Sequence, residues 1–139
     1  MEVILRDNRR YILRIDKGEE VFSSLLEFAD RQNVLAAAFQ GIGACGEVEM
    51  GDFDLKTKTY NKHTIKENLE IISLIGNIAV LDNKPALHAH GSFGRPDLSV
   101  LGGHVFKVVV SVTCEIFLIK LDGDLQRNPD KDSNLNLLS

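Results

Sequence analysis

The sequence contains few prolines, few cysteines and no long apolar run. Only 3 of its 139 residues are proline, and with 44% hydrophobic and 26% charged residues the composition excludes collagen-like and intrinsically disordered chains. The two cysteines, Cys45 and Cys114, can form at most one disulfide, so we expect reduced thiols and exclude a disulfide-stapled scaffold. No stretch approaches the ~20 apolar residues of a membrane-spanning helix, and residues 1–15 are too charged for a signal peptide. We therefore expect a soluble, cytoplasmic protein without a membrane partner.

An excess of positive charge is also missing. Sixteen Lys and Arg residues stand against 20 Asp and Glu residues, which gives a net charge of −4. This balance argues against a lone monomer that binds nucleic acid by electrostatic attraction. Two basic segments, residues 6–14 and 56–66, leave a local basic patch as the alternative. The length fits one domain over residues 1–139, which is long enough to bury a core.

The periodicity of the apolar residues predicts one early helix. Val21, Leu25 and Ala29 are among the apolar residues that recur at helical spacing over about residues 18–32. We expect Asp16 to cap this helix and Glu19 to complete a capping box.

Strands are expected along most of the remaining chain. A buried strand over residues 34–46 is expected to run into a tight turn at its glycines, and Gly76-Asn77 is expected to reverse the chain. Other strands are predicted at residues 3–5, 11–15, 47–55, 57–65, 69–76, 78–82, 85–93 and 105–120, and the terminal LNLL segment is expected to dock on the body. One helix followed by many strands favours an α+β fold with a mostly antiparallel (mixed) β-sheet and one main helix packed on it.

Three of the four histidines fall within residues 88–104. His88 and His90 are separated by one residue on an expected strand, so they share a face with Cα atoms about 6.6–6.8 Å apart. Gly102 and Gly103 precede His104 and leave room for a third imidazole beside the pair. Three neutral imidazoles and a water form a tetrahedral zinc site with an open position. The competing interpretation is that these are ordinary exposed or hydrogen-bonded histidines.

Other polar residues are weaker candidates for a site. Glu115 is a candidate general acid/base, or a carboxylate that orients a metal ligand, and Arg95 is a candidate anion-binding residue. An ordinary surface charge is the competing interpretation for both, and Glu70 is a similar but weaker candidate. His63 lies among four lysines, so we expect it in a solvated basic hairpin. The sequence has no Gly-x-Ser-x-Gly motif, no glycine-rich phosphate loop and no Cys-x-x-Cys pair.

Taken together, five segments of the sequence resemble the PPC domain, the module conserved in plants and prokaryotes. They are LRIDKGEEV, AAFQGIGACGEVEMGDFD, LEIISLIGNIA, LHAHGSFGRPDLSVLGGH and VVVSVTCEIFLIKLDG, so the resemblance covers nearly the whole chain. It implies a homotrimer, and it implies that His88, His90 and His104 are metal ligands as in some stand-alone prokaryotic members. Plant members carry AT-hooks ahead of this domain and act at DNA. The AT-hook core Arg-Gly-Arg-Pro does not occur here, so the part that touches DNA in the plant proteins is missing.

Two functional hypotheses follow from the residues and the resemblance. The first is a metal-binding, trimeric PPC-domain protein with a regulatory or ligand-binding role, associated with DNA through partners. The second is a small zinc-dependent lyase or hydrolase that acts on a small oxo acid, with Glu115 moving a proton and Arg95 holding a carboxylate. The domain is similar in fold to acetolactate decarboxylase, which also binds zinc through three histidines. Zinc is the expected metal, with nickel and iron as alternatives because imidazole suits all three.

Overall fold

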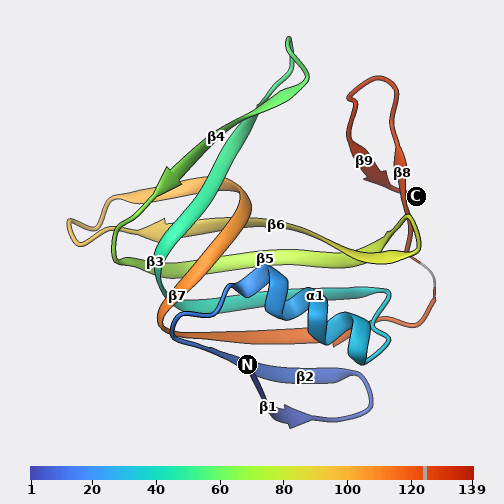
Figure 1. Cartoon of the computed structure of the whole chain (residues 1–139), viewed down its shortest axis with the longest axis horizontal. Coiled ribbons are helices and arrows are strands. Elements are labelled where there is room, and N and C mark those ends of the chain that lie inside the picture. Colours follow the sequence, from blue (N-terminus) through green and yellow to red (C-terminus); the bar gives the residue numbers. More distant parts are fainter. Residues whose placement is uncertain (124) are drawn as a thin grey trace.

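The computed structural model describes residues 1–123 and 125–139 and consists of a strongly bent sheet with one helix against it (Figure 1). Helix α1 spans Val21–Arg31. The strands, in chain order, are β1 (Glu2–Arg6), β2 (Arg10–Asp16), β3 (Ala37–Asp54), β4 (Thr59–Ile65), β5 (Leu69–Leu81), β6 (Lys84–Gly94), β7 (Val100–Lys120), β8 (Arg127–Pro129) and β9 (Asn136–Leu138). All ladders between these strands are antiparallel, which confirms the expected α+β fold with a mostly antiparallel sheet.

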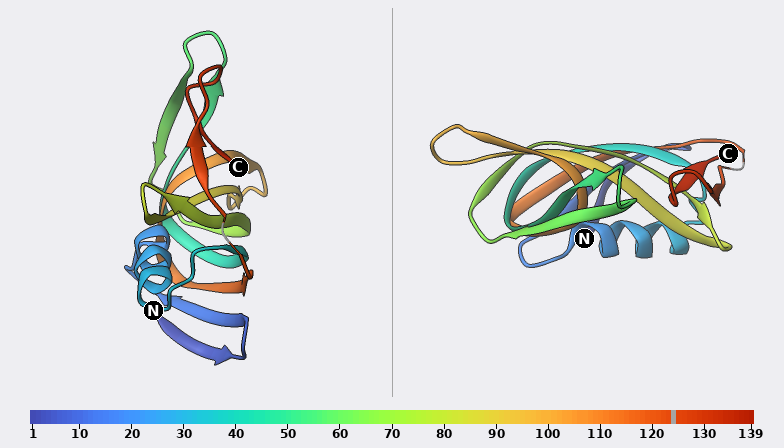
Figure 2. Two further views of the ribbon diagram at one scale, coloured as in Figure 1. Left: turned by 90° about the vertical axis from the view of Figure 1, so that its right-hand side faces the viewer. Right: turned by 90° about the horizontal axis from the view of Figure 1, so that it is seen from above.

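Strands β1 to β7 form one sheet that closes on itself over part of its width. Their order is β1-β2-β7-β6-β5-β3-β4, and β7 also pairs with β3. The closure is possible because β3 has 18 residues and β7 has 21, so each strand can pair with different neighbours along its length. The start of β7 therefore lies between β6 and β3. The small sheet of β8 and β9 and the β3–β4 hairpin project from the same side of the body (Figures 1 and 2).

Helix α1 covers one face of the sheet (Figure 2). Its buried residues Val21, Leu25, Phe28 and Ala29 pack into the core, as the helical periodicity predicts. The predicted cap at Asp16 is wrong, because Asp16 still belongs to β2 and pairs with Thr113 of β7.

Glu20 caps the helix instead of Asp16. Its carboxylate accepts hydrogen bonds from the backbone N–H groups of Phe22 and Ser23, at 2.9 and 2.7 Å. The same carboxylate accepts a hydrogen bond from the N–H of Val108 at 3.1 Å, which ties the start of the helix to β7.

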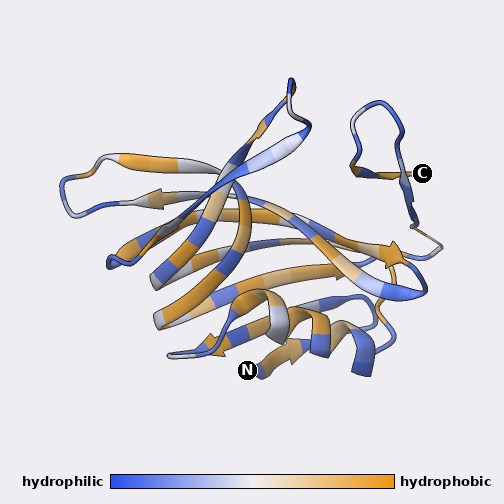
Figure 3. Ribbon diagram, turned by 45° about the horizontal axis from the view of Figure 1, so that its top comes forward, coloured by the Kyte–Doolittle hydropathy of each residue, from blue (hydrophilic) through white to orange (hydrophobic). Residues whose placement is uncertain are grey.

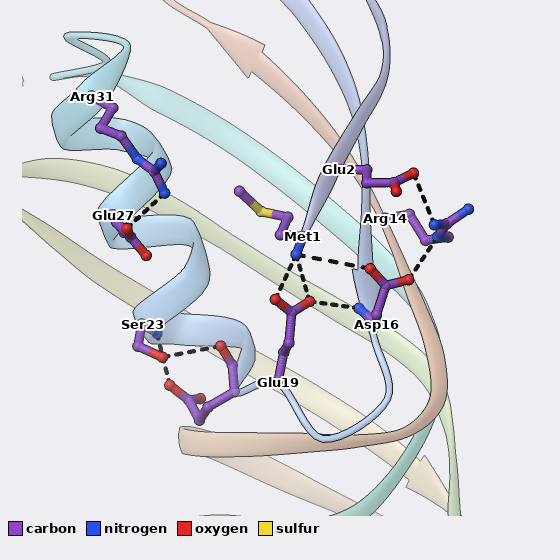
Figure 4. A network of polar contacts seen from close by, with 9 residues as sticks. Met1, Glu2, Arg14, Asp16, Glu19, Ser23, Glu27 and Arg31 are labelled. Atoms are coloured by element: carbon purple, nitrogen blue, oxygen red, sulfur yellow. Dashed lines mark hydrogen bonds and ion pairs between the residues drawn. The ribbon is translucent and has the colours of Figure 1, made fainter.

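Acidic side chains neutralise the basic residues near the start of the chain (Figure 4). Arg14 donates to Glu2 and Asp16, at 2.8 Å in each case. The carboxylate of Glu19 accepts from the backbone N–H of Asp16 and from the amino group of Met1. The predicted contact between Glu19 and the backbone of Asp16 therefore exists, but it stabilises the turn between β2 and the helix rather than capping the helix. Arg9 and Arg10 are paired with Asp122 and Asp7.

The glycines of β3 and β5 do not reverse the chain, so two of the predicted turns are wrong. Strand β3 runs straight through Gly41, Gly43 and Gly46, with irregular register against both of its neighbours. At Gly43 φ is 152°, and a Cβ atom there would lie 2.1 Å from the backbone oxygen of Thr113. Glycine therefore permits a bulge and a close backbone approach at this point.

The reversal expected at Gly76-Asn77 occurs five to seven residues later. Strand β5 continues to Leu81, and the two residues that follow, Asp82 and Asn83, have φ values of 50° and 63°. Two central residues with positive φ make the tight turn that suits a two-residue hairpin, and Asp and Asn tolerate that conformation. The turn places β6 antiparallel to β5, with Asn77 opposite His88.

The face of the sheet opposite the helix exposes several large apolar side chains. Phe117 is exposed on this face, whereas its neighbours Ile116 and Leu118 are buried on the other. Gln40 of β3 pairs with Phe117 on one side and with Ile75 on the other, so the three residues form one row across the sheet. The exposed side chains of this apolar face are Ile42, Ile72, Ile75, Phe117 and Ile119, which are 40–60% exposed. The alternation of apolar and polar residues along the strands is visible in Figure 3. Among the described residues, no helix has the length and hydropathy that crossing a membrane requires.

Candidate metal site

His88, His90 and His104 converge where β6 meets β7. His88 and His90 lie two residues apart on β6, and His90 is the direct partner of His104 in the β6–β7 ladder. The centroids of the three rings are 4.9–5.3 Å apart, and one ligand atom from each residue lies within 4.8 Å of the others. The structure thus brings together the three histidines that the sequence singled out. Across residues 1–123 and 125–139, this histidine triad is the one cluster of His, Cys, Asp or Glu that could hold a metal ion.

The backbone next to His104 is closely packed. His104 pairs with Gly51 of β3 as well as with His90 of β6, so it lies where three strands meet. A Cβ atom on Gly103 would lie 2.9 Å from the oxygen of Gly51, at a φ of 159°. The glycine before His104 therefore lets β3 and β7 come together, whereas the sequence analysis expected it only to leave room for the third imidazole.

Burial keeps two of the imidazoles in their neutral form. Burial, followed by the charges of Arg127 and His90, lowers the pKa of His88. Burial is also the main cause that lowers the pKa of His104 to about 4, and the charges of the neighbouring histidines, Lys62 and Arg127 add to it. A neutral imidazole is the form that binds a metal. The site is therefore ready to bind a cation at neutral pH.

One buried nitrogen of the histidine triad has no partner. Nε2 of His88 is buried and makes no hydrogen bond to any residue that the structure describes. Leaving a buried polar atom unsatisfied is costly, and such an atom calls for a role. Three imidazole nitrogens with an orphaned atom among them are a donor set that suits zinc, nickel or iron, so the residues present fit a transition metal ion.

Aromatic side chains surround His104, and the sequence did not reveal them. The rings of Tyr60 and Phe106 lie 4.6 and 4.5 Å from the ring of His104, measured between centroids. The Tyr60 hydroxyl is 3.4 Å from Nδ1 of His104. Lys62 places its ammonium group 3.8 Å from the centre of the Phe106 ring. The signal that could have found Tyr60 is a lone aromatic residue in a segment that otherwise looks like a solvated basic hairpin.

Two cavities adjoin the histidine triad, one on each side. The first, of about 570 Å³, lies beside the β3–β4 hairpin and is lined by His90, His104, Tyr60 and His63 among others. The second, of about 390 Å³, lies beside the β8–β9 hairpin and is lined by His88, His104, Tyr60 and Arg127 among others. The exposed His63, expected in a solvated hairpin, therefore also borders a cavity at the triad.

The structure does not bring the other sequence candidates to the triad. Glu115 is an exposed residue of β7 that lies between Ile42 and Arg14 on the neighbouring strands. Arg95 donates two hydrogen bonds to Glu67, at 3.0 and 3.1 Å. Arg95 and Glu70 line a different cavity, and Glu115 lines neither of the cavities beside the triad. Catalytic roles for Glu115 and Arg95 therefore remain predictions, since neither residue lies at the histidine triad within one chain.

Both cysteines are buried free thiols. Burial raises the pKa of Cys45 to about 11 and that of Cys114 to about 12, with smaller contributions from nearby negative groups. A thiol that stays protonated at neutral pH is a poor nucleophile and a poor metal ligand. The two cysteines are packing residues of the core.

Several solved structures share this architecture over the full chain. A candidate DNA-binding protein from Bacteroides thetaiotaomicron is 30% identical, with a TM-score of 0.93 over 97% of this chain and 94% of that one. A plant- and prokaryote-conserved (PPC) protein from Pyrococcus horikoshii is 33% identical, with a TM-score of 0.90 over 100% and 97%. A metal-containing protein from Archaeoglobus fulgidus is 32% identical, with a TM-score of 0.90 over 100% and 99%. No curated protein matches the sequence.

A more distant likeness concerns the fold alone. The α-acetolactate decarboxylase of Bacillus subtilis is 16% identical, with a TM-score of 0.58 over 88% of this chain and 57% of that one. This confirms the expected similarity of fold, and it carries no activity to this chain.

The sequence also matches a family model directly. The match covers residues 5–122. This range contains the end of β1, strands β2 to β7, the helix and the histidine triad. The chain therefore belongs to the family of the Plants and Prokaryotes Conserved (PCC) domain.

Proposed function

We propose that this protein binds one divalent transition metal ion, most suitably zinc, through His88, His90 and His104, and that it works as a ligand-binding or regulatory module. The observation that carries the proposal is the convergence of three imidazoles, one of which, His88, carries a buried Nε2 without a partner among the described residues. The related metal-containing protein from Archaeoglobus fulgidus supports it. Three protein ligands leave a further position on a tetrahedral ion for water or a small ligand.

The residues around the triad prepare the site for a ligand. When bound, a zinc ion held by three imidazoles supplies a Lewis acid that polarises an oxygen of its ligand. Tyr60 packs against His104 and holds its hydroxyl next to the His104 ring, which fixes the orientation of that imidazole. Apolar side chains line much of both cavities and offer contacts to the carbon atoms of a ligand.

A homotrimer is part of this proposal. The apolar face formed by Ile42, Ile72, Ile75, Phe117 and Ile119 lies opposite the helix, and no element of the described chain covers it. An exposed apolar surface of this kind is typical of a protein–protein interface. His90 follows Ile75 in the same row of the sheet, so the proposed interface borders the metal site.

The second candidate is a small zinc-dependent lyase or hydrolase that acts on a small oxo acid. The observation that favours it is the 570 Å³ cavity, which is lined by Tyr60, His90 and His104, with the Tyr60 hydroxyl 3.4 Å from Nδ1 of His104. The predicted general acid/base Glu115 lies elsewhere on β7, and the acidic residue that lines this cavity, Asp52, accepts a hydrogen bond from Asn61. We therefore rank ligand binding above catalysis.

We propose that association with DNA acts through a partner rather than by direct binding. The related candidate DNA-binding protein from Bacteroides thetaiotaomicron motivates the question. However, Lys62 is paired with Glu49, and Lys66 and Lys107 are paired with Glu47. These pairs remove much of the positive charge that phosphate contacts require.

Metal analysis tests the proposal. Protein purified without an affinity tag and dialysed against zinc is expected to hold one ion per chain, and His90→Ala is expected to hold far less. His63→Ala is the matched control, because His63 borders the same cavity and lies outside the triad. Equal zinc content in the parent, His90→Ala and His63→Ala proteins would overturn the proposal.

A further inference from the structure

The second cavity beside the triad combines an apolar wall with two unpartnered polar atoms. It lies between β6 and the β8–β9 hairpin and has a volume of about 390 Å³, within the range of small-molecule sites. Its apolar wall consists of Leu81, Ala86, Leu87, Leu135, Leu137 and Leu138. Two lining residues, His88 and Arg127, each carry a buried nitrogen, Nε2 and Nε respectively, that has no hydrogen-bond partner in the described part of the chain.

Arg127 is held in place without a carboxylate. It donates a hydrogen bond of 2.6 Å to the side-chain oxygen of Asn77 and one of 2.9 Å to the backbone oxygen of Asn136. Within residues 1–123 and 125–139, no acidic side chain forms an ion pair with it. Asn77 is the ladder partner of His88, so the contact with Asn77 fixes the guanidinium beside the triad.

The charges at this cavity are unbalanced. Among residues 1–123 and 125–139, no Asp or Glu lines it, whereas Arg127 contributes one positive charge. Three neutral imidazoles would not compensate the charge of a divalent ion either. The half-buried guanidinium of Arg127 costs free energy unless an anion or another acceptor compensates its charge. Arginine binds carboxylates and phosphates with two parallel hydrogen bonds. The cavity therefore calls for an anionic ligand.

The apolar lining of the cavity indicates which class of anion fits it. Apart from Arg127 and the two histidines, Tyr60 and Asn136 are the polar residues that line it, whereas six lining side chains are apolar and suit a short hydrocarbon tail better than the outer oxygens of a phosphate. We propose that this cavity binds a small aliphatic carboxylate, whose carboxylate group lies between Arg127 and the metal position and whose tail packs against the β8–β9 hairpin. The inference rests on the proposed metal site and names the chemical class of its ligand. It also gives the C-terminal hairpin a function as a specificity wall.

Calorimetric titration of the zinc-loaded protein with 3-methylbutanoate tests the inference. We expect 3-methylbutanoate to bind at least about tenfold more tightly than acetate, because three further carbon atoms leave water. Inorganic phosphate is expected to bind more weakly than 3-methylbutanoate. Tighter binding of phosphate would overturn the assignment of the carboxylate class.

Two variants separate the role of Arg127 from that of the wall. Arg127→Met is expected to weaken binding of both carboxylates by about tenfold or more and to leave the zinc content unchanged, since Arg127 is outside the triad. Leu137→Asp is expected to weaken binding of 3-methylbutanoate more than that of acetate. The control Arg95→Met, at an arginine outside this cavity, should change neither.

Zinc content distinguishes failure of the inference from failure of the proposed function. If the parent protein holds no zinc, the proposed function falls and this inference falls with it. If zinc is bound in full and both Arg127→Met and Leu137→Asp bind the carboxylates like the parent, only the inference is overturned.

Discussion

His90 and His104 face each other directly across the β6–β7 ladder, with ring centroids 5.3 Å apart. The geometry of the triad thus depends on the register of two strands whose histidines are separated by 13 residues of chain. A shift of register by one residue would turn one of the two rings to the other face of the sheet. The metal site therefore forms only if β6 and β7 pair in this register.

We expect the metal-free protein to lose stability as the pH falls from about 6.5 to about 4. The pKa of His104 is about 4 in the folded chain, against about 6.5 for an unperturbed histidine, so in this window the unfolded chain binds more protons than the folded one. Stability then rises with pH, on the order of 2 kcal/mol across the window after allowance for solvent at the half-buried ring. The lowered pKa of His88 acts in the same direction.

Urea denaturation at several pH values, in the presence of a chelator, measures this effect. The variant His104→Gln removes the titrating group and should show a flatter dependence of the unfolding free energy on pH than the parent. His63→Gln removes an exposed histidine and should keep the parent's slope. Identical slopes for all three proteins would contradict the prediction.

The exposed apolar face predicts the assembly state. Light scattering should give a mass near three times 15.4 kDa. Ile75→Lys places a charge in the middle of the apolar face and should shift the protein towards monomers, because burying an unpaired charge is costly. Leu98→Lys, at a loop residue that is 88% exposed, should not alter the mass. A parent protein that is monomeric at all concentrations would show that the apolar face has another role.

Direct binding to duplex DNA is expected to be weak or absent at physiological salt. A trimer carries a net charge of −12, which is three times −4, and the basic side chains Arg9, Arg10 and Arg14 are paired with acids. A gel-shift titration with sub-micromolar protein should show no salt-dependent complex. A complex that weakens with added salt, and weakens further in a Lys58→Ala/Lys62→Ala variant, would disprove this prediction.

Two glycines of β3 provide a matched test of the bulge. Gly43→Ala should destabilise the fold by more than about 2 kcal/mol, because the new Cβ would collide with the backbone of Thr113. Gly46→Ala should change the free energy of unfolding by less than about 1 kcal/mol, since the nearest atom to its Cβ is Ser111 Cβ at 3.6 Å. Thermal unfolding of the two variants measures the difference. Equal effects would mean that β3 adjusts freely at Gly43.

Local patterns in the sequence were enough to predict the helix and the histidine pair. The helical spacing of Val21, Leu25 and Ala29 depends only on the 3.6-residue turn, and His88 and His90 share a face because side chains alternate along a strand. The glycines before His104 predicted the third imidazole, and the family resemblance, confirmed by the match over residues 5–122, supported it. The turns predicted at the glycines of β3 and β5 are wrong, because the conformational freedom of glycine that permits a turn also permits a bulge inside a long strand.

Tertiary structure alone decided what surrounds the triad. Tyr60 reaches His104 from 44 residues away along the chain, and Arg127 reaches Asn77 across 50 residues. No local pattern names the partner of either residue, because the first contact depends on β7 pairing with β3 and β6 and the second on the C-terminal hairpin lying beside β6. The sequence by itself determined which side chains could bind a metal. The closure of the sheet decided which cavities, aromatic rings and charges they meet, since long-range strand pairing is set by the burial of the whole core rather than by any single segment.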